Sequence, residues 1–284
     1  MAIVAATHFS DRLGAAVSRK RTQLVIGLDP VVARLPSELD GDIGAFCRGI
    51  VDAVEPYAVA VKPQSAFFEA HGAEGMRVFW EACSYARAAG LLVIADAKRG
   101  DIGSTAEAYA EAFSGRADAV TVNPYLGGDS VAPFIEAARR DGSGVFCLVK
   151  TSNPGSADVQ DAVLADGRKV WERVAGLVGL WGAEEVGPGG LSAVGAVVGA
   201  TFPQEIAQAR RLLPAAPFLL PGIGAQGGSP ADVAAAFSDD PASALVSASR
   251  SVIYATDASG GDWRAAAAAE AKRLAGEIWR VAAG

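Results

Sequence analysis

Short apolar runs recur along the 284-residue chain and are separated by segments with helical spacing. The runs are rich in Val, Ile, Leu and Ala, and they do not alternate with polar residues. Strands that are buried on both faces, as in parallel sheets, have this pattern. We therefore expect strands at residues 23–29, 58–64, 91–98, 117–125, 144–152, 191–201, 217–224 and 243–252.

The segments between these runs carry apolar residues three and four positions apart, which is typical of helices that cover a core. Strand–helix alternation repeated eight times predicts an α/β chain folded as a (β/α)8 TIM barrel, with a doubly wound open sheet as the alternative. Helices are expected at residues 42–54, 73–90, 104–113, 131–140, 169–182, 203–213, 230–237 and 262–280.

No low-complexity linker divides the chain, so we expect a single barrel domain over residues 1–284, with an N-terminal lead-in helix. One connection, at about 153–190, is longer than usual for this architecture. Its polar start predicts a loop after the fifth strand, its middle predicts a helix, and Gly187–Gly190 form a flexible tail.

Composition narrows the possible functions. The chain is 51% hydrophobic and 20% charged, which is typical of a globular protein with one large core. No apolar run reaches the roughly 18 residues of a membrane span, and the first residues lack the basic start of a secretory signal. A net charge of −7 with scattered Lys and Arg argues against broad nucleic-acid binding. The net charge does not exclude a small anionic ligand, because such a ligand needs only one local basic pocket.

The cysteines and histidines give no pattern of a metal site. Cys47, Cys83 and Cys147 lie in apolar or helical contexts without C-x-x-C spacing, so we interpret them as buried free thiols of a cytoplasmic protein. His8 and His71 lie far along the chain from the charged cluster described next. A histidine-based triad or metal centre is therefore not expected.

The stretch "IADAKRGDIGST", residues 94–105, places alternating acids and bases directly after an apolar run. In such barrels the active site forms at the carboxyl ends of the strands. Asp96 and Lys98 are two residues apart, so on an extended strand they share a face, and Lys62 ends the neighbouring strand. Lys62, Asp96, Lys98 and Asp101 could form a row in which carboxylates keep the lysines protonated. The alternative interpretation is a solvated turn.

A row of this kind suits some reactions better than others. A protonated lysine is a poor Schiff-base nucleophile, because that chemistry needs the free amine. It can instead stabilise a developing carbanion and then protonate it.

The segment "PGIGAQGGSP", residues 221–230, ends a strand and enters the next helix. Glycines such as Gly224 and Gly227 permit close backbone approach, and N–H groups near a helix start favour an anion. Loops after the seventh and eighth strands are the usual phosphate site of this barrel, so Gln226 and Arg250 are candidate donors. A plain turn is the alternative, and the pattern is not that of a nucleoside-triphosphate P-loop.

Taken together, these motifs resemble the orotidine 5′-phosphate decarboxylase family, and the long 153–190 stretch resembles its larger bacterial, type 2 subgroup. The resemblance runs from "GLDP" through "VKPQSAFFE", "IADAKRGDIGST", "TVNPYLGGD", "KTSNPGS" and "PGIGAQGG" to "SRSVIY". It implies a carboxy-lyase that converts orotidine 5′-phosphate to UMP without a cofactor, the last step of pyrimidine synthesis.

The resemblance also implies a role for each residue that matches a motif. Lys98 would protonate C6 after carbon dioxide leaves, and Asp96 would lie near the substrate carboxylate. Lys62 would support this network and the ribose. Asp29 would contact the ribose, and Ser152 would hydrogen-bond the pyrimidine.

The remaining roles concern the phosphate and a second copy of the chain. Gln226 and Arg250 would grip the phosphate. Asp101 and Thr105 would reach into the site of a partner copy, so the resemblance implies a homodimer.

Two other functions stay open on the sequence. Sugar-phosphate decarboxylases and synthases of the same superfamily share the D-x-K-x-x-D motif and use magnesium, but they carry an acidic ligand where this chain has Lys62. A protonated lysine cannot ligate magnesium. A non-catalytic nucleotide-phosphate binding protein would keep Arg250 and the glycine-rich loop but would not need the acid–base row.

Overall fold

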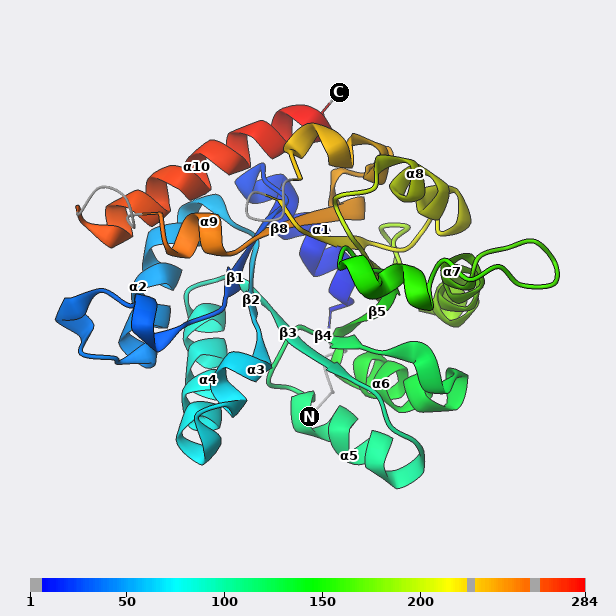
Figure 1. Ribbon diagram of the computed structural model, residues 1–284, viewed down its shortest axis with the longest axis horizontal. Helices are drawn as coiled ribbons and strands as arrows, with labels where there is room; N and C mark the ends of the chain where they lie inside the picture. Colours follow the sequence, from blue (N-terminus) through cyan, green and yellow to red (C-terminus); the bar gives the residue numbers. More distant parts are fainter. Residues whose placement is uncertain (1–6, 224–227, 256–260, 284) are drawn as a thin grey trace.

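The structure, a computed structural model, describes residues 7–223, 228–255 and 261–283. Within these ranges eight parallel strands pair in chain order, and β8 pairs back with β1 to close a barrel (Figure 1). This confirms the predicted (β/α)8 barrel and excludes the doubly wound sheet. The strands are β1 (Leu24–Leu28), β2 (Ala60–Pro63), β3 (Leu92–Arg99), β4 (Ala119–Val122), β5 (Gly144–Lys150), β6 (Val194–Val198), β7 (Phe218–Pro221) and β8 (Ala244–Ala248).

Helices surround the barrel on its outside (Figure 1). The α-helices are α1 (Phe9–Lys20), α2 (Ile43–Val54), α3 (Ser65–Glu69), α4 (Gly72–Ala88), α5 (Gly103–Phe113), α6 (Gly128–Asp141), α7 (Val170–Gly182), α8 (Pro203–Leu212), α9 (Arg250–Ile253) and α10 (Trp263–Ala282). Short 3-10 helices join them: η1 (Val32–Arg34), η2 (Ser37–Leu39), η3 (Glu55–Tyr57), η4 (Pro124–Leu126), η5 (Pro154–Asp158), η6 (Ala183–Glu185), η7 (Pro230–Ala236) and η8 (Pro241–Ser243).

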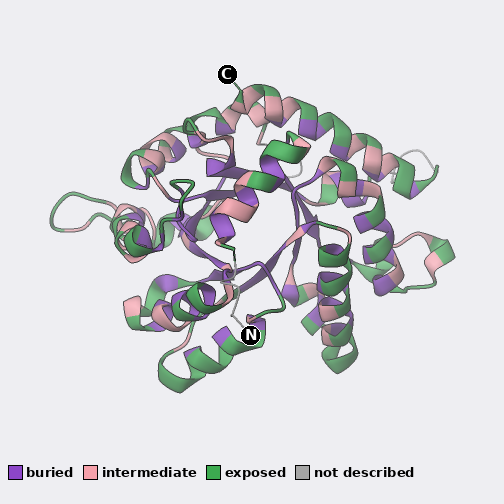
Figure 2. Ribbon diagram, turned by 180° about the vertical axis from the view of Figure 1, so that it is seen from behind, coloured by how far each residue is buried: buried purple, intermediate pink, exposed green. Residues whose placement is uncertain are grey.

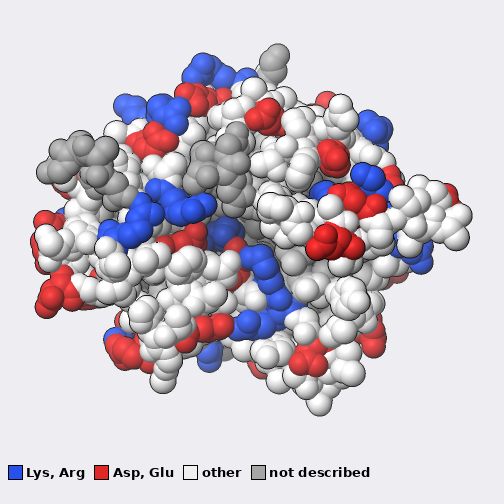
Figure 3. All heavy atoms as spheres, in the orientation of Figure 1, with Lys and Arg blue, Asp and Glu red and all other residues white. Residues whose placement is uncertain are grey.

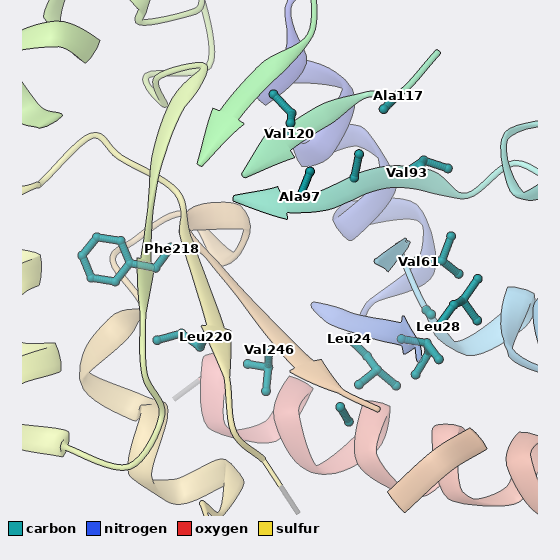
Figure 4. Packing of buried hydrophobic residues seen from close by; sticks show 14 of the residues in the cluster. Leu24, Leu28, Val61, Val93, Ala97, Ala117, Val120, Phe218, Leu220 and Val246 are labelled. Atoms are coloured by element: carbon teal, nitrogen blue, oxygen red, sulfur yellow. The ribbon is translucent and has the colours of Figure 1, made fainter. Parts of the chain in front are cut away.

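Both faces of the strands are buried, which explains their unbroken apolar sequences. In Figure 2 the strands at the centre are purple, which marks buried residues, and the outward sides of the helices are green, which marks exposed ones. One apolar layer, which includes Leu24 and Val246, lies between the strands and the helices, and part of it is drawn in Figure 4. A second cluster, which includes Val25 and Leu219, fills the barrel interior.

The lead-in helix α1 packs against this second cluster. Phe9, Leu13 and Val17 of α1 are buried in it, and the Phe9 ring meets Phe146 of β5 edge-on at 5.9 Å between centroids. A Cβ on Gly144, the first residue of β5, would lie 2.5 Å from the Phe9 ring. Helix α1 therefore covers the amino-terminal end of the barrel, and the carboxyl ends of the strands are left to form a site.

The connection at 153–190 has local structure of its own. It begins with η5, continues through a bridge between Val163 and Lys169, and then forms α7 and η6. The two ends of this connection thus lie at β5 and β6. Its first part, residues 153–169, leaves the strand end at which a site is expected.

Most element boundaries differ from the prediction by one to four residues, and the difference at β8 matters most for the site. The expected strand at 243–252 stops at Ala248, and Arg250 begins α9 instead of lying on the strand. Val252 and Ile253 are buried in that short helix, and a short buried apolar run does not distinguish helix from strand. Residues 230–236 form a 3-10 helix, and α5 begins at Gly103. Among the described residues, no helix is long and apolar enough to cross a membrane.

Candidate functional site

A cavity of about 500 Å³ opens at the carboxyl ends of the strands. Figure 3 looks onto this face and shows basic and acidic side chains around a central hollow. Polar groups meet apolar ones in this cavity, which is typical of small-molecule sites. Consecutive strands from β2 to β8 each contribute a side chain to its wall: Lys62, Asp96, Thr121, Leu148, Val197, Leu219 and Ser247.

The structure brings together three members of the predicted charged row. Lys62 Nζ donates to Asp96 Oδ2 at 2.5 Å, and Lys98 Nζ donates to Asp96 Oδ1 at 2.5 Å. The side chains of Lys62 and Asp96 are each 7% exposed, whereas that of Lys98 is 41% exposed. Asp96 thus lies between two ammonium groups, one buried below it and one reaching the open part of the cavity. The solvated-turn interpretation is wrong for these three residues.

The electrostatics of the row keep Asp96 and Lys62 charged. Burial by itself would raise the pKa of Asp96, but Lys62 and Lys98 outweigh it and lower that pKa to about 2. Burial would likewise lower the pKa of Lys62, but attraction to Asp96 and Asp29 raises it above its ordinary value. At neutral pH the cavity therefore holds an ionised Asp96 next to a protonated Lys62.

Thr121 of β4 organises this end of β3, and the sequence analysis missed it. Its Oγ1 donates to Asp96 Oδ1 at 3.0 Å and accepts from the backbone N–H groups of Ala97 and Lys98 at 3.1 and 2.9 Å. Lys98 has a φ of 47°, and the pairing of β3 with β4 is irregular here. Asp96 and Lys98 therefore meet through a bulge rather than along an extended strand. The polar Thr within the apolar run "AVTV" is the feature of the sequence that could have identified this residue.

Asp101 and Thr105 do not line the cavity of their own chain. Asp101 Oδ1 accepts from the N–H of Ile102 at 2.8 Å, and Thr105 is exposed on α5. A single chain therefore brings together three of the four charged groups.

Asp29 lies at the end of β1, where it lines the same cavity. Its Oδ1 is buried and finds no hydrogen-bond donor among the described residues. Tyr254 fixes the backbone here, because its hydroxyl donates to the carbonyl of Asp29 and accepts from the N–H of Val31. A carboxylate oxygen is thus held in the cavity ready to accept a hydrogen bond.

Ser152 lies on the opposite wall, just after β5. Its backbone packs so closely against Gly199 that a Cβ at residue 199 would lie 3.0 Å from Ser152 Cβ. Thr151, Asn153 and Gln160 line the cavity beside it, although sequence reasoning did not select Asn153 or Gln160.

The predicted phosphate end is partly described. Arg250 begins α9 and lines the cavity together with Ser249, Gly222 and Ile223. A Cβ on Gly27 would lie 1.8 Å from Ser249 Oγ, so the glycine in β1 lets this turn pack against the barrel.

Three predicted residues of the glycine-rich segment, Gly224, Gln226 and Gly227, lie outside the described residues. Where the structure does describe the chain, it contains no group of three or more His, Cys, Asp or Glu that could hold a metal ion.

Comparisons with known proteins show what the chain is similar to. The model of the orotidine 5′-phosphate decarboxylase / HUMPS family matches residues 22–261. Orotidine 5′-phosphate decarboxylase of Rhodopirellula baltica is 43% identical over 268 residues, covering 87% of this chain and 88% of that protein. The enzyme of the same name from Deinococcus radiodurans is 45% identical over 266 residues, covering 91% and 94%. A Streptomyces avermitilis crystal structure superimposes with a TM-score of 0.86 at 39% identity, covering 100% of this chain and 99% of that one.

Proposed function

Because the chain belongs to the orotidine 5′-phosphate decarboxylase / HUMPS family, we propose that its cavity binds orotidine 5′-phosphate and that the Lys62–Asp96–Lys98 row carries out the decarboxylation. The reaction releases carbon dioxide from C6 of the pyrimidine and gives UMP, the last step of UMP biosynthesis. The observation that carries the assignment of roles is the Asp96 side chain held between Lys62 Nζ and Lys98 Nζ, at 2.5 Å from each.

The row suits a reaction that leaves an electron pair on carbon. When the C6–carboxylate bond breaks, its electron pair stays on C6, and a fixed ammonium nearby stabilises that charge. Lys98 is the ammonium that reaches the open cavity, so it then transfers a proton to C6. Asp96 faces the departing carboxylate and orients Lys98. Buried Lys62 keeps Asp96 ionised and in place.

The remaining cavity residues hold the parts of the substrate that do not react. Asp29 presents a carboxylate oxygen that can accept from a ribose hydroxyl. Ser152 borders the place of the pyrimidine, and Arg250 forms the cationic end for the phosphate, with Gln226, Gly224 and Gly227 as further candidate donors. Binding energy from this phosphate supports alignment at C6.

The active form in this proposal is a homodimer, in which Asp101 and Thr105 complete the partner's site. Three exposed apolar side chains lie around this part of the chain: Ile102, Tyr125 and Leu126 are 57%, 81% and 48% exposed. The segment before Asp101 contacts η4, since Asn123 N donates to the carbonyl of Arg99 at 2.7 Å. Exposed apolar side chains near two polar residues that do not line the cavity of their own chain fit a surface that a second copy covers.

The proposal needs no cofactor, because the ammonium groups supply the charge stabilisation. It places the enzyme in the cytoplasm, where thiols stay reduced. Cys47, Cys83 and Cys147 are free and buried, as such a compartment allows. We also assign the chain to the larger bacterial, type 2 subgroup, on its 153–190 segment.

An absorbance assay with purified protein and orotidine 5′-phosphate, with and without EDTA, tests this proposal. We expect conversion to UMP at a rate that the chelator does not change. Activity abolished by EDTA and restored by magnesium would favour the metal-dependent sugar-phosphate enzymes of the superfamily. UMP binding without turnover would favour a non-catalytic binding protein.

Mixing two inactive variants tests the shared site. In a dimer of Lys98→Ala with Asp101→Ala, one site carries both changes and the other carries neither. Random mixing should therefore restore about a quarter of the unaltered activity. A mixture that stays as inactive as its components would contradict the role of Asp101 in the partner's site.

A further inference from the structure

The segment 153–169 runs green between β5 and α7 in Figure 1. Two adjacent residues of this segment, Gln160 and Asp161, make hydrogen bonds with the end of β5 and the residue after it. Asp161 Oδ2 accepts from Lys150 Nζ at 2.8 Å, and Asp161 Oδ1 accepts from Lys169 Nζ at 3.2 Å. The Lys150 side chain is 2% exposed, and its Nζ also lies 3.4 Å from Ser156 Oγ. The last residue of β5 therefore points into the segment and not into the cavity.

The residue before Asp161 makes a second connection. Gln160 Oε1 accepts from the backbone N–H of Thr151 at 2.9 Å, and Gln160 Nε2 donates to Thr151 Oγ1 at 2.7 Å. Thr151 Oγ1 donates in turn to Asn153 Oδ1 at 2.7 Å. One amide group thus fixes both the main chain and the side chain of the residue that precedes Ser152.

Ser152 is held from its other side by β6. Gly199 N donates to the carbonyl of Lys150 at 2.8 Å, and a Cβ at residue 199 would make a tight contact of 3.0 Å with Ser152. Gln160, Thr151 and Ser152 all line the cavity. Gly199 behind Ser152 and the Gln160–Thr151 pair beside it both constrain the position of Ser152.

We propose that Gln160 is a positioning residue for recognition of the pyrimidine, held in place by the Lys150–Asp161 ion pair. It fixes Thr151 and thereby aims Ser152 at the base. This inference rests on the proposed function, in which Ser152 contacts the pyrimidine. It gives this part of the long connection a role in recognition of the base. It gives the connection no role in binding the phosphate, because Arg250 follows β8 and not β5.

Calorimetric titration of UMP and of ribose 5-phosphate, which lacks the base, tests the inference. Gln160→Met keeps the length of the side chain but removes both hydrogen bonds. We expect it to weaken UMP binding about tenfold, or about 1.4 kcal/mol, while ribose 5-phosphate binds as before. Gln160→Glu keeps an acceptor for the Thr151 N–H and should retain most of the UMP affinity. Asp161→Asn should give the same ligand pattern as Gln160→Met with a smaller loss.

The matched control is Asp166→Asn, in the exposed Asp166–Arg168 pair of the same segment, which should bind both ligands normally. Unchanged UMP affinity in Gln160→Met, or equal losses for UMP and ribose 5-phosphate, would overturn the inference. A loss of thermal stability in Asp161→Asn with normal UMP binding would overturn the role of the ion pair. The proposed function fails separately, if the unaltered protein does not convert orotidine 5′-phosphate.

Discussion

Replacing Lys98 by alanine should abolish turnover and leave the barrel folded. The two lysines that flank Asp96 make ion pairs of equal length, 2.5 Å, but differ in exposure. Removing Lys98 leaves Asp96 still paired with buried Lys62 and hydrogen-bonded to Thr121. Because the Lys98 side chain is 41% exposed, its pair contributes only about 0–1 kcal/mol to stability. The melting temperature should therefore fall by no more than about 4 °C.

The expected loss of activity is far larger. A positioned proton donor contributes about 10²–10⁴-fold, and one fixed charge at a developing anion contributes about 10²–10³-fold. Since Lys98 serves in both roles, we expect kcat to fall by at least about 10⁴-fold, or more than about 5 kcal/mol in the barrier. Lys62→Met, unlike Lys98→Ala, should lower the free energy of unfolding by about 3 kcal/mol, because it removes the buried partner of the buried Asp96 charge.

The measurements are kcat by the absorbance assay and the melting temperature by circular dichroism. Lys272→Ala, an exposed lysine on α10, is the matched control and should change neither. A Lys98→Ala variant that is fully folded and turns over within tenfold of the unaltered rate would refute the assignment.

Three further predictions concern the phosphate, Thr121 and pH. Arg250→Ala should raise KM for orotidine 5′-phosphate about 10–100-fold and leave the slow reaction of phosphate-free orotidine unchanged; equal losses on both substrates would count against a phosphate role. Thr121→Val should lower kcat at least about tenfold and destabilise the fold by about 2 kcal/mol, since two backbone N–H groups lose their acceptor, whereas Thr121→Ser should keep both properties. Because Asp96 has its pKa lowered from 3.8 to about 2, it contributes about 2 kcal/mol of stability above pH 4 that is lost as pH falls toward 2. The raised pKa of Lys62 makes its own contribution fully present below pH 10.5 and lost only as pH rises through that pKa. Urea unfolding should therefore show the stability gap between the unaltered protein and Asp96→Asn narrowing from pH 6 to pH 2.5, and a constant gap would contradict the ion-pair account.

The barrel could be predicted because its physical cause is local. Strands buried on both faces need unbroken apolar runs, and an observed strand lies in each of the eight runs, with only β3 extending one residue beyond its run, to Arg99. The end of β8 could not be predicted in the same way. Val252 and Ile253 are apolar and buried in α9, as they would be in a continued strand, and only the turn at Ser249 decides between the two.

The candidate site could be predicted where charged residues interrupt the carboxyl end of an apolar strand, as Lys62 does in β2 and Asp96 and Lys98 do in β3. Residues of the site could not be predicted where their hydrogen-bond partner comes from elsewhere in the chain. Thr121 reaches Asp96 from the next strand, and Gln160 reaches Thr151 across a loop whose path is set by the Lys150–Asp161 ion pair. Such contacts depend on the folded geometry and leave no periodic signal in the sequence.

A crystal structure of the dimer with bound UMP would show where the base lies relative to the Lys62–Asp96–Lys98 row. We predict that C6 of the base lies within about 3.5 Å of Lys98 Nζ, while Asp96 stays between Lys62 and Lys98. We also predict the phosphate at Arg250 and the partner's Asp101 beside the same base. UMP bound with C6 away from Lys98, or with the row opened toward solvent, would contradict this prediction.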